Sequence, residues 1–220
     1  MVYNSAMHNA DIFEGLKSIP GPGVILYPIE LGQAREIFQA IEESRAELLR
    51  TMPWENRNVG DVKNFIRATI EKRRAGAALH LAIYAEWASG PNFQPGQIAG
   101  NPSESGIQSR KNLGPDAQAT TFAGIIGLHK FDPYTPRGEV GYWVRTSLHG
   151  RGLAGAALAA VIAWSAETLG LARLDAQTWD QNIPSQRVLE KNGFQKEGFQ
   201  PKGELCHGIW HDMILWGKLL

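Results

Sequence analysis

The chain has 220 residues, enough for one domain or two small ones, and long enough to bury a substantial core. Hydrophobic residues make up 43% and charged residues 20% of the sequence, which is typical of a globular protein. The 22 Lys and Arg residues balance the 22 Asp and Glu residues, so we expect neither a nucleic acid nor a membrane as partner.

Cysteine content and the first residues bear on location and on metal binding. The single cysteine, Cys206, excludes an internal disulfide framework and a paired-cysteine metal site, and we expect no bound metal. The first eight residues lack the charged and apolar regions of a signal peptide, which favours a reducing cytoplasm. Residues 1–22 contain Gly and Pro without periodicity, so we predict a poorly ordered lead-in and a single domain over 23–220.

The first third of that domain predicts one strand and two helices. Residues 24–30 are rich in Val, Ile and Leu and predict a strand. Apolar residues at helical spacing predict a helix over 31–51, and Pro53 ends it. The same spacing predicts a second helix over 62–74, with a basic group in its last turn.

A long polar segment interrupts the predicted sheet. Residues 79–85 predict a strand, after which Gly, Pro, Ser, Asn and Gln dominate from 86 to 120 with almost no apolar residues. A segment of this length and composition predicts a disordered loop between two hairpin strands. Residues 121–131 and 139–144 then predict two more strands, joined by a turn rich in Asp and Pro.

A glycine-rich run follows the strand that ends at residue 144. Gly150, Gly152 and Gly155 open an apolar helix that we expect to end at Gly170. A turn without side chains lets the N–H groups of the first helical turn point at an anion, assisted by the helix dipole. The run therefore predicts a phosphate-binding loop. Downstream we expect a strand over 171–178, a short helix from 182 to 192 and two closing strands.

One interpretation of this run is a dinucleotide site, because residues 150–155 match the pattern G-x-G-x-x-G and Asp175 lies about twenty residues further on. Three observations count against it. The preceding strand alternates polar and apolar residues, which suits a half-exposed antiparallel strand. The residues that follow are too few for further βαβ units, and the strands upstream are in hairpin order.

The run also resembles a family motif. The sequence His149-Gly150-Arg151-Gly152-Leu153-Ala154 is similar to the acyl-CoA pyrophosphate loop of the GNAT acetyltransferases, whose pattern is [Q/R]-x-x-G-x-[G/A]. Gly152 and Ala154 match the last two defined positions, whereas His149 stands where the family has Gln or Arg. This departure removes an amide or guanidinium from the mouth of the loop but leaves its backbone donors in place.

Two further segments narrow the resemblance to one subfamily. Residues 182–194 resemble the pattern N-x-x-S-x-x-[VL]-x-E-K-x-G-F of the RimJ/RimL ribosomal-protein N-terminal acetyltransferases, and Met52-Pro53-Trp54 is similar to another of their features. The resemblance covers residues 24–220, interrupted by the 86–120 loop. It implies an α+β GNAT fold: a mixed, mostly antiparallel sheet of about seven strands, flanked by about four helices and splayed at a β-bulge.

The resemblance also implies acetyl-CoA as the acetyl donor and assigns residues to it. Backbone N–H groups of the loop would bind the pyrophosphate, and the backbone at the splayed strand end would contact pantetheine and the thioester carbonyl. Asn182 and Ser185 would also contact the cofactor. The cofactor-binding residues expected from the loop and strand end are Trp143, Val144, Arg145, His149, Gly150, Arg151, Gly152, Leu153, Ala154 and Gly155.

Two residues are candidates for proton transfer. By resemblance, Ser185 lies near the sulfur and would protonate the leaving thiolate, and Glu204 would act as the base through water. Each also has a plain structural explanation. Asn182 is a good N-cap with Ser185 in the first turn of its helix, and Glu204 could be an exposed strand carboxylate near His207 and His211.

The acceptor is the part of the function that these motifs constrain least. We expect an N-acetyltransferase that acts on a primary amine, with a protein N-terminal α-amine as the leading acceptor. A small amine, such as an aminoglycoside, polyamine or amino acid, is the alternative acceptor. A CoA-binding protein without turnover is the third interpretation. Whether the chain forms a homodimer is left open by the sequence.

Overall fold

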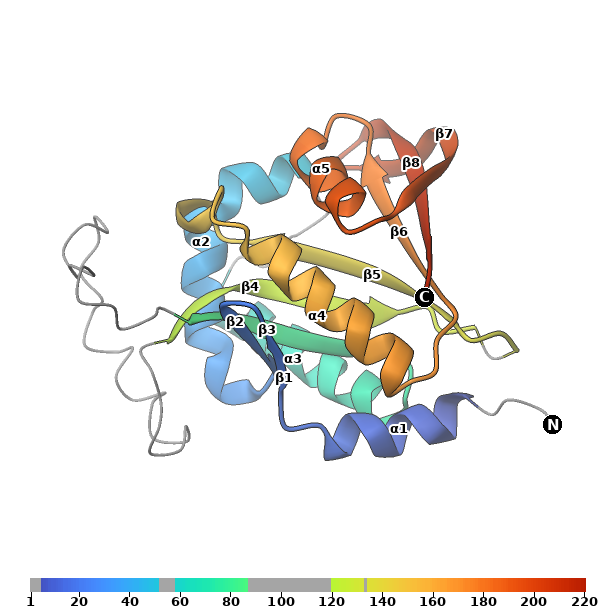
Figure 1. Ribbon diagram of the computed structural model, residues 1–220. Helices are drawn as coiled ribbons and strands as arrows, with labels where there is room; N and C mark the ends of the chain where they lie inside the picture. Colours follow the sequence, from blue (N-terminus) through green and yellow to red (C-terminus); the bar gives the residue numbers. More distant parts are fainter. Residues whose placement is uncertain (1–4, 52–57, 87–119, 133) are drawn as a thin grey trace, which may run out of the picture.

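A computed structural model describes residues 5–51, 58–86, 120–132 and 134–220. Residues 87–119 of the predicted loop and the Met52-Pro53-Trp54 motif lie outside these ranges. The described residues form one sheet of eight strands in the order β1-β2-β3-β4-β5-β6-β8-β7, together with five α-helices (Figure 1). None of these helices is long and apolar enough to cross a membrane.

The strands are β1 (Ile19–Gly21), β2 (Val24–Pro28), β3 (Leu79–Glu86), β4 (Thr120–His129), β5 (Arg137–Val144), β6 (Arg173–Trp179), β7 (Gln195–Cys206) and β8 (Ile209–Leu219). The helices are α1 (Ser5–Gly15), α2 (Ala34–Thr51), α3 (Val59–Arg74), α4 (Leu153–Glu167) and α5 (Ile183–Lys191). Two short 3₁₀ turns, η1 (Leu31–Gln33) and η3 (Thr146–Leu148), precede α2 and the glycine loop. The predicted α+β architecture, a mixed and mostly antiparallel sheet flanked by helices, is confirmed, with an additional strand and helix.

That additional strand and helix come from the N-terminal segment. A poorly ordered lead-in was predicted for residues 1–22, and this prediction is wrong from Ser5 onward, where α1 and β1 form. Phe13 is 1% exposed, and its ring lies 6.3 Å from that of Trp164 in α4. Glu14 of α1 pairs with Arg73 of α3 at 3.1 Å. The segment is ordered by these distant contacts, which a pattern search along the local sequence does not detect.

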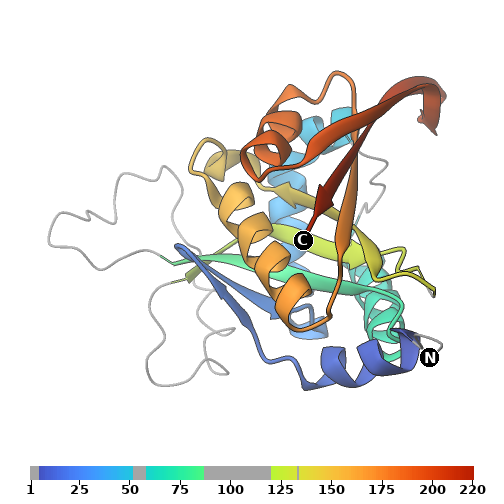
Figure 2. The same ribbon diagram turned by 45° about the vertical axis from the view of Figure 1, so that its right-hand side comes forward.

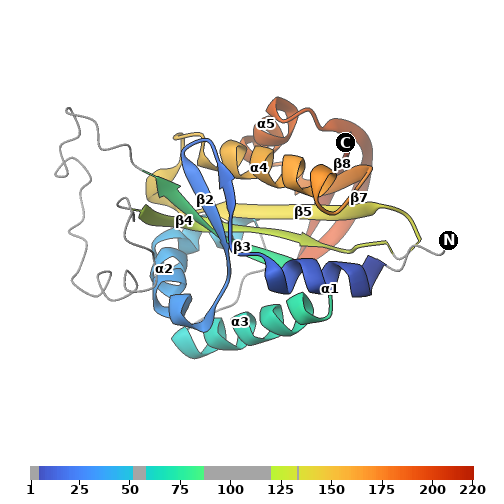
Figure 3. The same ribbon diagram turned by 60° about the horizontal axis from the view of Figure 1, so that its bottom comes forward.

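Helices cover both faces of the sheet, as the view in Figure 3 shows. Helices α2 and α3 lie on one face, where Ile37 and Ile66 are fully buried against Phe122 of β4. Helix α4 lies on the opposite face, where Leu158 packs into a second core with Ile126 and other apolar residues of the strands. The alternating side chains of β3 and β4 therefore supply two cores, one on each face.

The strand pairing changes from antiparallel to parallel between β5 and β6. Strands β1 to β5 are antiparallel neighbours in sequence order, whereas β5 and β6 are parallel and pair only at Arg137–Arg173, Gly138–Leu174 and Glu139–Asp175. Beyond these three pairs the two strands separate toward the end of β5. Strand β6 stays paired with β8, and β7 and β8 form a long hairpin that curves away from the helices (Figure 2).

Beyond their last pair, Glu139–Asp175, strands β5 and β6 leave an opening between them. A β-bulge lies beside this opening, in β4 rather than in β5, the strand that precedes the glycine loop. The register between β3 and β4 shifts at Ile83 and Tyr84, which leaves Ala123 of β4 without an opposite residue. Gly124 follows with a φ of 157°, and a Cβ there would lie 2.0 Å from the Trp143 carbonyl oxygen. Glycine is therefore required for the close approach of β4 to β5 at the open end of the sheet.

Candidate active site

The glycine loop begins a helix at the open end of β5. Gly150 and Gly152 have φ values of 74° and 77°, in the left-handed region that glycine adopts without strain, and nothing lies within 4 Å of a Cβ placed on either. Gly152 is the N-cap of α4 and has no side chain to cap it. The N–H groups of Leu153, Ala154 and Gly155 consequently form a concave group of donors that fits an anionic pyrophosphate.

The turn before this loop is attached to helix α2. The Ser44 Oγ accepts a hydrogen bond from the Thr146 N–H at 2.9 Å, and Glu43 accepts one from the Ser147 N–H at 2.9 Å. Glu43 also forms an ion pair with Arg145. Burial acts to raise the pKa of Glu43, but the hydrogen bonds from Arg145 and Ser147 outweigh it and lower the pKa. Glu43 is therefore a charged group that holds η3 in place.

Of the three strand-end residues expected to contact the cofactor, Val144 has its backbone directed into the opening. The Arg145 N–H donates to the Ala123 carbonyl at 2.7 Å, and the Trp143 carbonyl also approaches β4. Alternation along the strand then directs the N–H and carbonyl of Val144 toward β6. The His149 Nε2 lies 2.8 Å from the Val144 carbonyl oxygen, so the residue at the family's Gln/Arg position contacts this strand end.

Ser185 contacts the opposite side of the opening through Tyr142. The Ser185 Oγ donates to the Tyr142 Oη at 3.1 Å, and the Tyr142 hydroxyl donates to the Ser185 carbonyl at 3.2 Å. The Asn182 side chain caps α5 by accepting from the Ser185 N–H at 3.2 Å. Burial raises the pKa of Tyr142 to about 12, so this phenol is a neutral hydrogen-bonding group at physiological pH.

Glu204 lies on the β7–β8 hairpin in contact with β6. The indole Nε1 of Trp179 donates to its Oε2 at 2.5 Å, and the Trp179 ring stacks on His211 with centroids 3.6 Å apart. Glu204 is half-buried, so the interpretation of a fully exposed strand carboxylate does not hold. His207 is exposed at the hairpin turn, and Cys206 is buried beside Trp179 and Met213.

A cavity of about 190 Å³ lies between the end of α2 and the start of α5. Its lining residues are Glu47, Arg50, Gln181, Asn182 and Pro184. Asn182 therefore caps α5 and also lines a space large enough for part of a substrate. Because the lining carries two opposite charges and two amide side chains, the cavity fits a polar group better than an apolar one.

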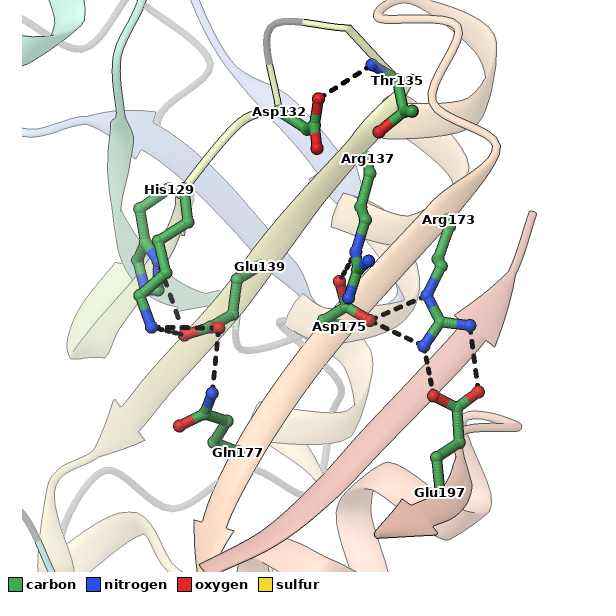
Figure 4. A network of polar contacts seen from close by, with 10 residues as sticks. His129, Asp132, Thr135, Arg137, Glu139, Arg173, Asp175, Gln177 and Glu197 are labelled. Carbon is green, nitrogen blue, oxygen red and sulfur yellow. Dashed lines mark hydrogen bonds and ion pairs between the residues drawn. The ribbon is translucent and has the colours of Figure 1, made fainter. Parts of the chain in front are cut away.

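Ion pairs close the other end of the opening, where β5 and β6 still pair. Asp175 pairs with both Arg137 and Arg173, and Arg173 continues to Glu197 on β7 (Figure 4). Glu139 accepts from Lys130 at 2.9 Å and from Gln177 at 3.4 Å in the same network. The β5–α4–β6 segment is a parallel βαβ unit, as a dinucleotide fingerprint requires. Its Asp175, however, is engaged in ion pairs at the end of β5 away from the loop.

The sequence interpretation missed several residues of this site. Tyr142 was not assigned a role, and nothing in the sequence connects it with Ser185. Trp179, Glu43 and Ser44 were not singled out, because their contacts reach across strands or between helix and loop. The one feature of the sequence that could have indicated these residues concerns Tyr142 and Trp179. They lie near the ends of the strands that precede the glycine loop and the Asn182 turn.

Comparison with known proteins places the chain in a family. The acetyltransferase (GNAT) domain family matches residues 24–195, and the chain belongs to this family. A putative ribosomal N-acetyltransferase, YdaF of Bacillus subtilis, is 31% identical over 99 residues, which cover 45% of this chain and 54% of YdaF. The ribosomal-protein-serine acetyltransferase of Escherichia coli is 29% identical over 97 residues, which cover 44% of this chain and 54% of the relative.

These alignments span about half the length of both curated relatives. Similarity in structure extends further. The structure of RimL, a ribosomal L7/L12 α-N-protein acetyltransferase in complex with coenzyme A, superimposes with a TM-score of 0.74 and 17% identity. The superposition covers 93% of this chain and 98% of RimL. At this identity the similarity establishes the shared fold over nearly the whole of both chains.

Proposed function

We propose that this protein is an acetyl-CoA-dependent N-acetyltransferase whose acceptor is the α-amino group of a protein. The observation that carries the proposal is the separation of β5 from β6 next to an uncapped, glycine-initiated helix in a GNAT domain. The names of the relatives, ribosomal-protein acetyltransferases, support a protein acceptor. The balanced charge and the single, buried cysteine favour a cytoplasmic enzyme without nucleic acid or membrane partners.

The donor would bind with its pyrophosphate on the N–H groups of Leu153, Ala154 and Gly155, and pantetheine would lie along the open edge of β5. The N–H of Val144 is directed into this opening and would donate to pantetheine or to the thioester carbonyl oxygen. A fixed backbone donor at the developing oxyanion contributes substantially to the rate. His149 and Asn182 would line the path of the cofactor, and Arg151 would add positive charge at the loop.

The reaction removes two protons from the acceptor nitrogen and supplies one to the sulfur. Glu204 would take a proton from the acceptor ammonium through water, and the neutral amine would attack the thioester carbon. The C–S bond then breaks as the amide forms, and Ser185 would give its proton to the departing thiolate. Ser185 would regain a proton, through water, from the nitrogen, which loses its second proton as it becomes an amide. The bond of Ser185 to the Tyr142 hydroxyl, at 3.1 Å, keeps the Ser185 hydroxyl at the opening. Metal ions have no part in this scheme.

The test is a screen for CoA release with acetyl-CoA and three classes of acceptor: peptides with free N-termini, the same peptides acetylated at the N-terminus, and small amines. We expect thiol release with free peptides only. If CoA is released only with an aminoglycoside, polyamine or amino acid, the acceptor is a small amine and not a protein α-amine. CoA binding without release in any arm would instead indicate a CoA-binding protein, and a thermal shift with NAD but not with CoA would overturn the acyl-CoA site.

A further inference from the structure

Trp179 contacts the proposed base directly and is held rigidly. It is 4% exposed, and its indole N–H donates to the Glu204 Oε2 at 2.5 Å. A buried donor that bonds a carboxylate has little competition from water, so the hydrogen bond is stronger than an exposed one. The bond crosses the sheet, since Trp179 ends β6 and Glu204 lies on β7 at the far side of β8.

Three groups fix the tryptophan in place. The His211 ring stacks on the indole at 3.6 Å with an interplanar angle of 6°, and His211 is itself the cross-strand partner of Glu204. The side-chain amide of Gln186 in α5 donates to the Trp179 carbonyl at 3.3 Å and to the Asp180 carbonyl at 2.7 Å. The Asn182 N–H also donates to the Trp179 carbonyl, at 3.0 Å. Trp179 thereby connects the helix that carries Ser185 to the strand that carries Glu204.

We propose that Trp179 is a positioning residue for the acceptor's proton transfer: its indole N–H holds the Oε2 of Glu204 and leaves Oε1 to accept the proton. The inference rests on the proposed function, because it assumes that Glu204 is the base. The Trp179 N–H has no charge and stabilises the carboxylate form of Glu204 through its dipole. When the acceptor ammonium loses its proton to Oε1, Trp179 keeps its own, so the indole orients the base without exchanging protons with it.

Other titratable groups surround the carboxylate and must be separated from it in the test. His211 and Asp212 lie on β8, Cys206 lies on β7 beyond Glu204, and Asp180 follows β6. Of these, His211 and Cys206 share the face of Glu204, and His211 stacks on Trp179. A His211→Gln variant that lost as much activity as Glu204→Gln would assign the base to His211 instead.

The decisive variant is Trp179→Phe, which keeps an aromatic ring against His211 and removes the N–H donor together with the five-membered ring that carries it. We expect kcat to fall about tenfold, because a hydrogen bond to a charged group is lost, while the KM for acetyl-CoA stays unchanged. The readout is kcat per folded molecule, so that a loss of folded enzyme does not count as an effect. The split between a lower kcat and an unchanged KM distinguishes positioning from a merely structural role.

The matched control is Trp216→Phe. Trp216 is 2% exposed, and its indole N–H donates to the Thr178 Oγ1 at 2.9 Å, so this change removes a similar buried bond that does not involve Glu204. It should leave both kcat per folded molecule and the KM for acetyl-CoA unchanged. A wild-type kcat in Trp179→Phe would overturn the inference. An equal effect of both tryptophan variants would also overturn it.

Glu204→Gln separates this inference from the proposed function. If Glu204→Gln turns over normally, Glu204 is not the base, and both that assignment and the inference are wrong. If Glu204→Gln loses activity while Trp179→Phe is normal, the inference alone is wrong. When both single variants lose activity, combining them should add no further loss to that of Glu204→Gln, because Trp179 acts only through this carboxylate.

Discussion

The two halves of the sheet on either side of the β5–β6 opening are built differently. Strands β1 to β5 form a continuous antiparallel unit with helices on both faces, and β3 and β4 are buried over most of their length. Strands β6, β8 and β7 carry more of their side chains at the surface, and β7 in particular is exposed along most of its length. A rigid half thus faces a half whose polar and aromatic side chains remain accessible to ligands.

The two halves of the sheet also supply different parts of the proposed site. The N-terminal half supplies backbone groups and a loop. These are the edge of β5 and the η3 turn, which residues of α2 hold in place. The C-terminal half supplies the side chains proposed for proton transfer, Ser185 and Glu204. Substitutions of buried residues in the first half should therefore change stability, and substitutions of the proton-transfer residues in the second should change kcat. The following predictions test this division.

The largest expected effect is on stability, from Ile66→Ala in α3. Ile66 is 0% exposed in the core between α3 and the sheet, and truncation of such a residue costs about 2–5 kcal/mol of unfolding free energy. Urea titration should show this loss, and kcat per folded molecule should stay at the wild-type value. Leu49→Ala, which truncates a residue of α2 that is 42% exposed, is the control with little effect. A fall in kcat per folded molecule would contradict the division.

The next effect is a pH dependence of stability that originates from His80 in β3. Burial lowers the pKa of His80 to about 4 from 6.5, and its Nδ1 makes no hydrogen bond to the described residues. Between these values the unfolded chain binds a proton that the native state does not. Stability should therefore fall by up to about 3 kcal/mol as the pH drops from 6.5 to 4, and level off below that.

The measurement for His80 is a series of urea titrations from pH 7 to pH 4 on the wild type and on His80→Gln, which does not titrate. Acidic groups and His129, whose pKa burial also lowers, contribute to both curves and cancel in the difference. The difference should therefore shrink toward acidic pH. Parallel curves would show that the pKa of His80 is the same in the native and unfolded states.

Ser185→Ala should lower kcat about 100-fold, within the range for loss of a positioned acid, with little change in the KM for acetyl-CoA. Stability should change little, because the Ser185 N–H keeps its bond to Asn182. Ser165→Ala is the matched control: this serine of α4 is 0% exposed and its hydroxyl makes no hydrogen bond to the described residues. Normal turnover in Ser185→Ala would show that another group protonates the thiolate.

The parts of this division that depend on neighbouring residues could be predicted from the sequence, and the parts that depend on distant contacts could not. The glycine loop and the Asn182 cap follow from residues within one turn, and the structure has a helix start at each position. Helices α2 and α3 follow from periodicity. By contrast, α1 depends on contacts of Phe13 with Phe131 and Trp164, more than a hundred residues away in the sequence. Such contacts leave no local pattern.

The same distinction between local patterns and distant contacts applies to the site. The family motif assigned Ser185 and Glu204 but not the residues that hold them, since Tyr142 and Trp179 meet their partners across strands. The motif also assigned three consecutive strand-end residues to the cofactor, whereas strand alternation directs only Val144 of these into the opening. The bulge of β4 at Ala123 depends on its register with β3, and a single strand's sequence does not specify a register.

The smallest expected effect comes from the point where the halves meet, at Glu43. Glu43→Gln keeps an acceptor for the Ser147 N–H but removes the charge that pairs with Arg145. We expect the KM for acetyl-CoA to rise several-fold, about 1 kcal/mol, with kcat nearly unchanged, because η3 loses part of its attachment to α2. Initial rates over a range of acetyl-CoA concentrations give both constants. Glu42→Gln removes the neighbouring charge, which pairs with Arg45 on the surface of α2, and should leave KM unchanged. Equal KM values in the two variants would mean that the loop keeps its shape without the Glu43 charge, and that the boundary between the halves lies within β5 itself.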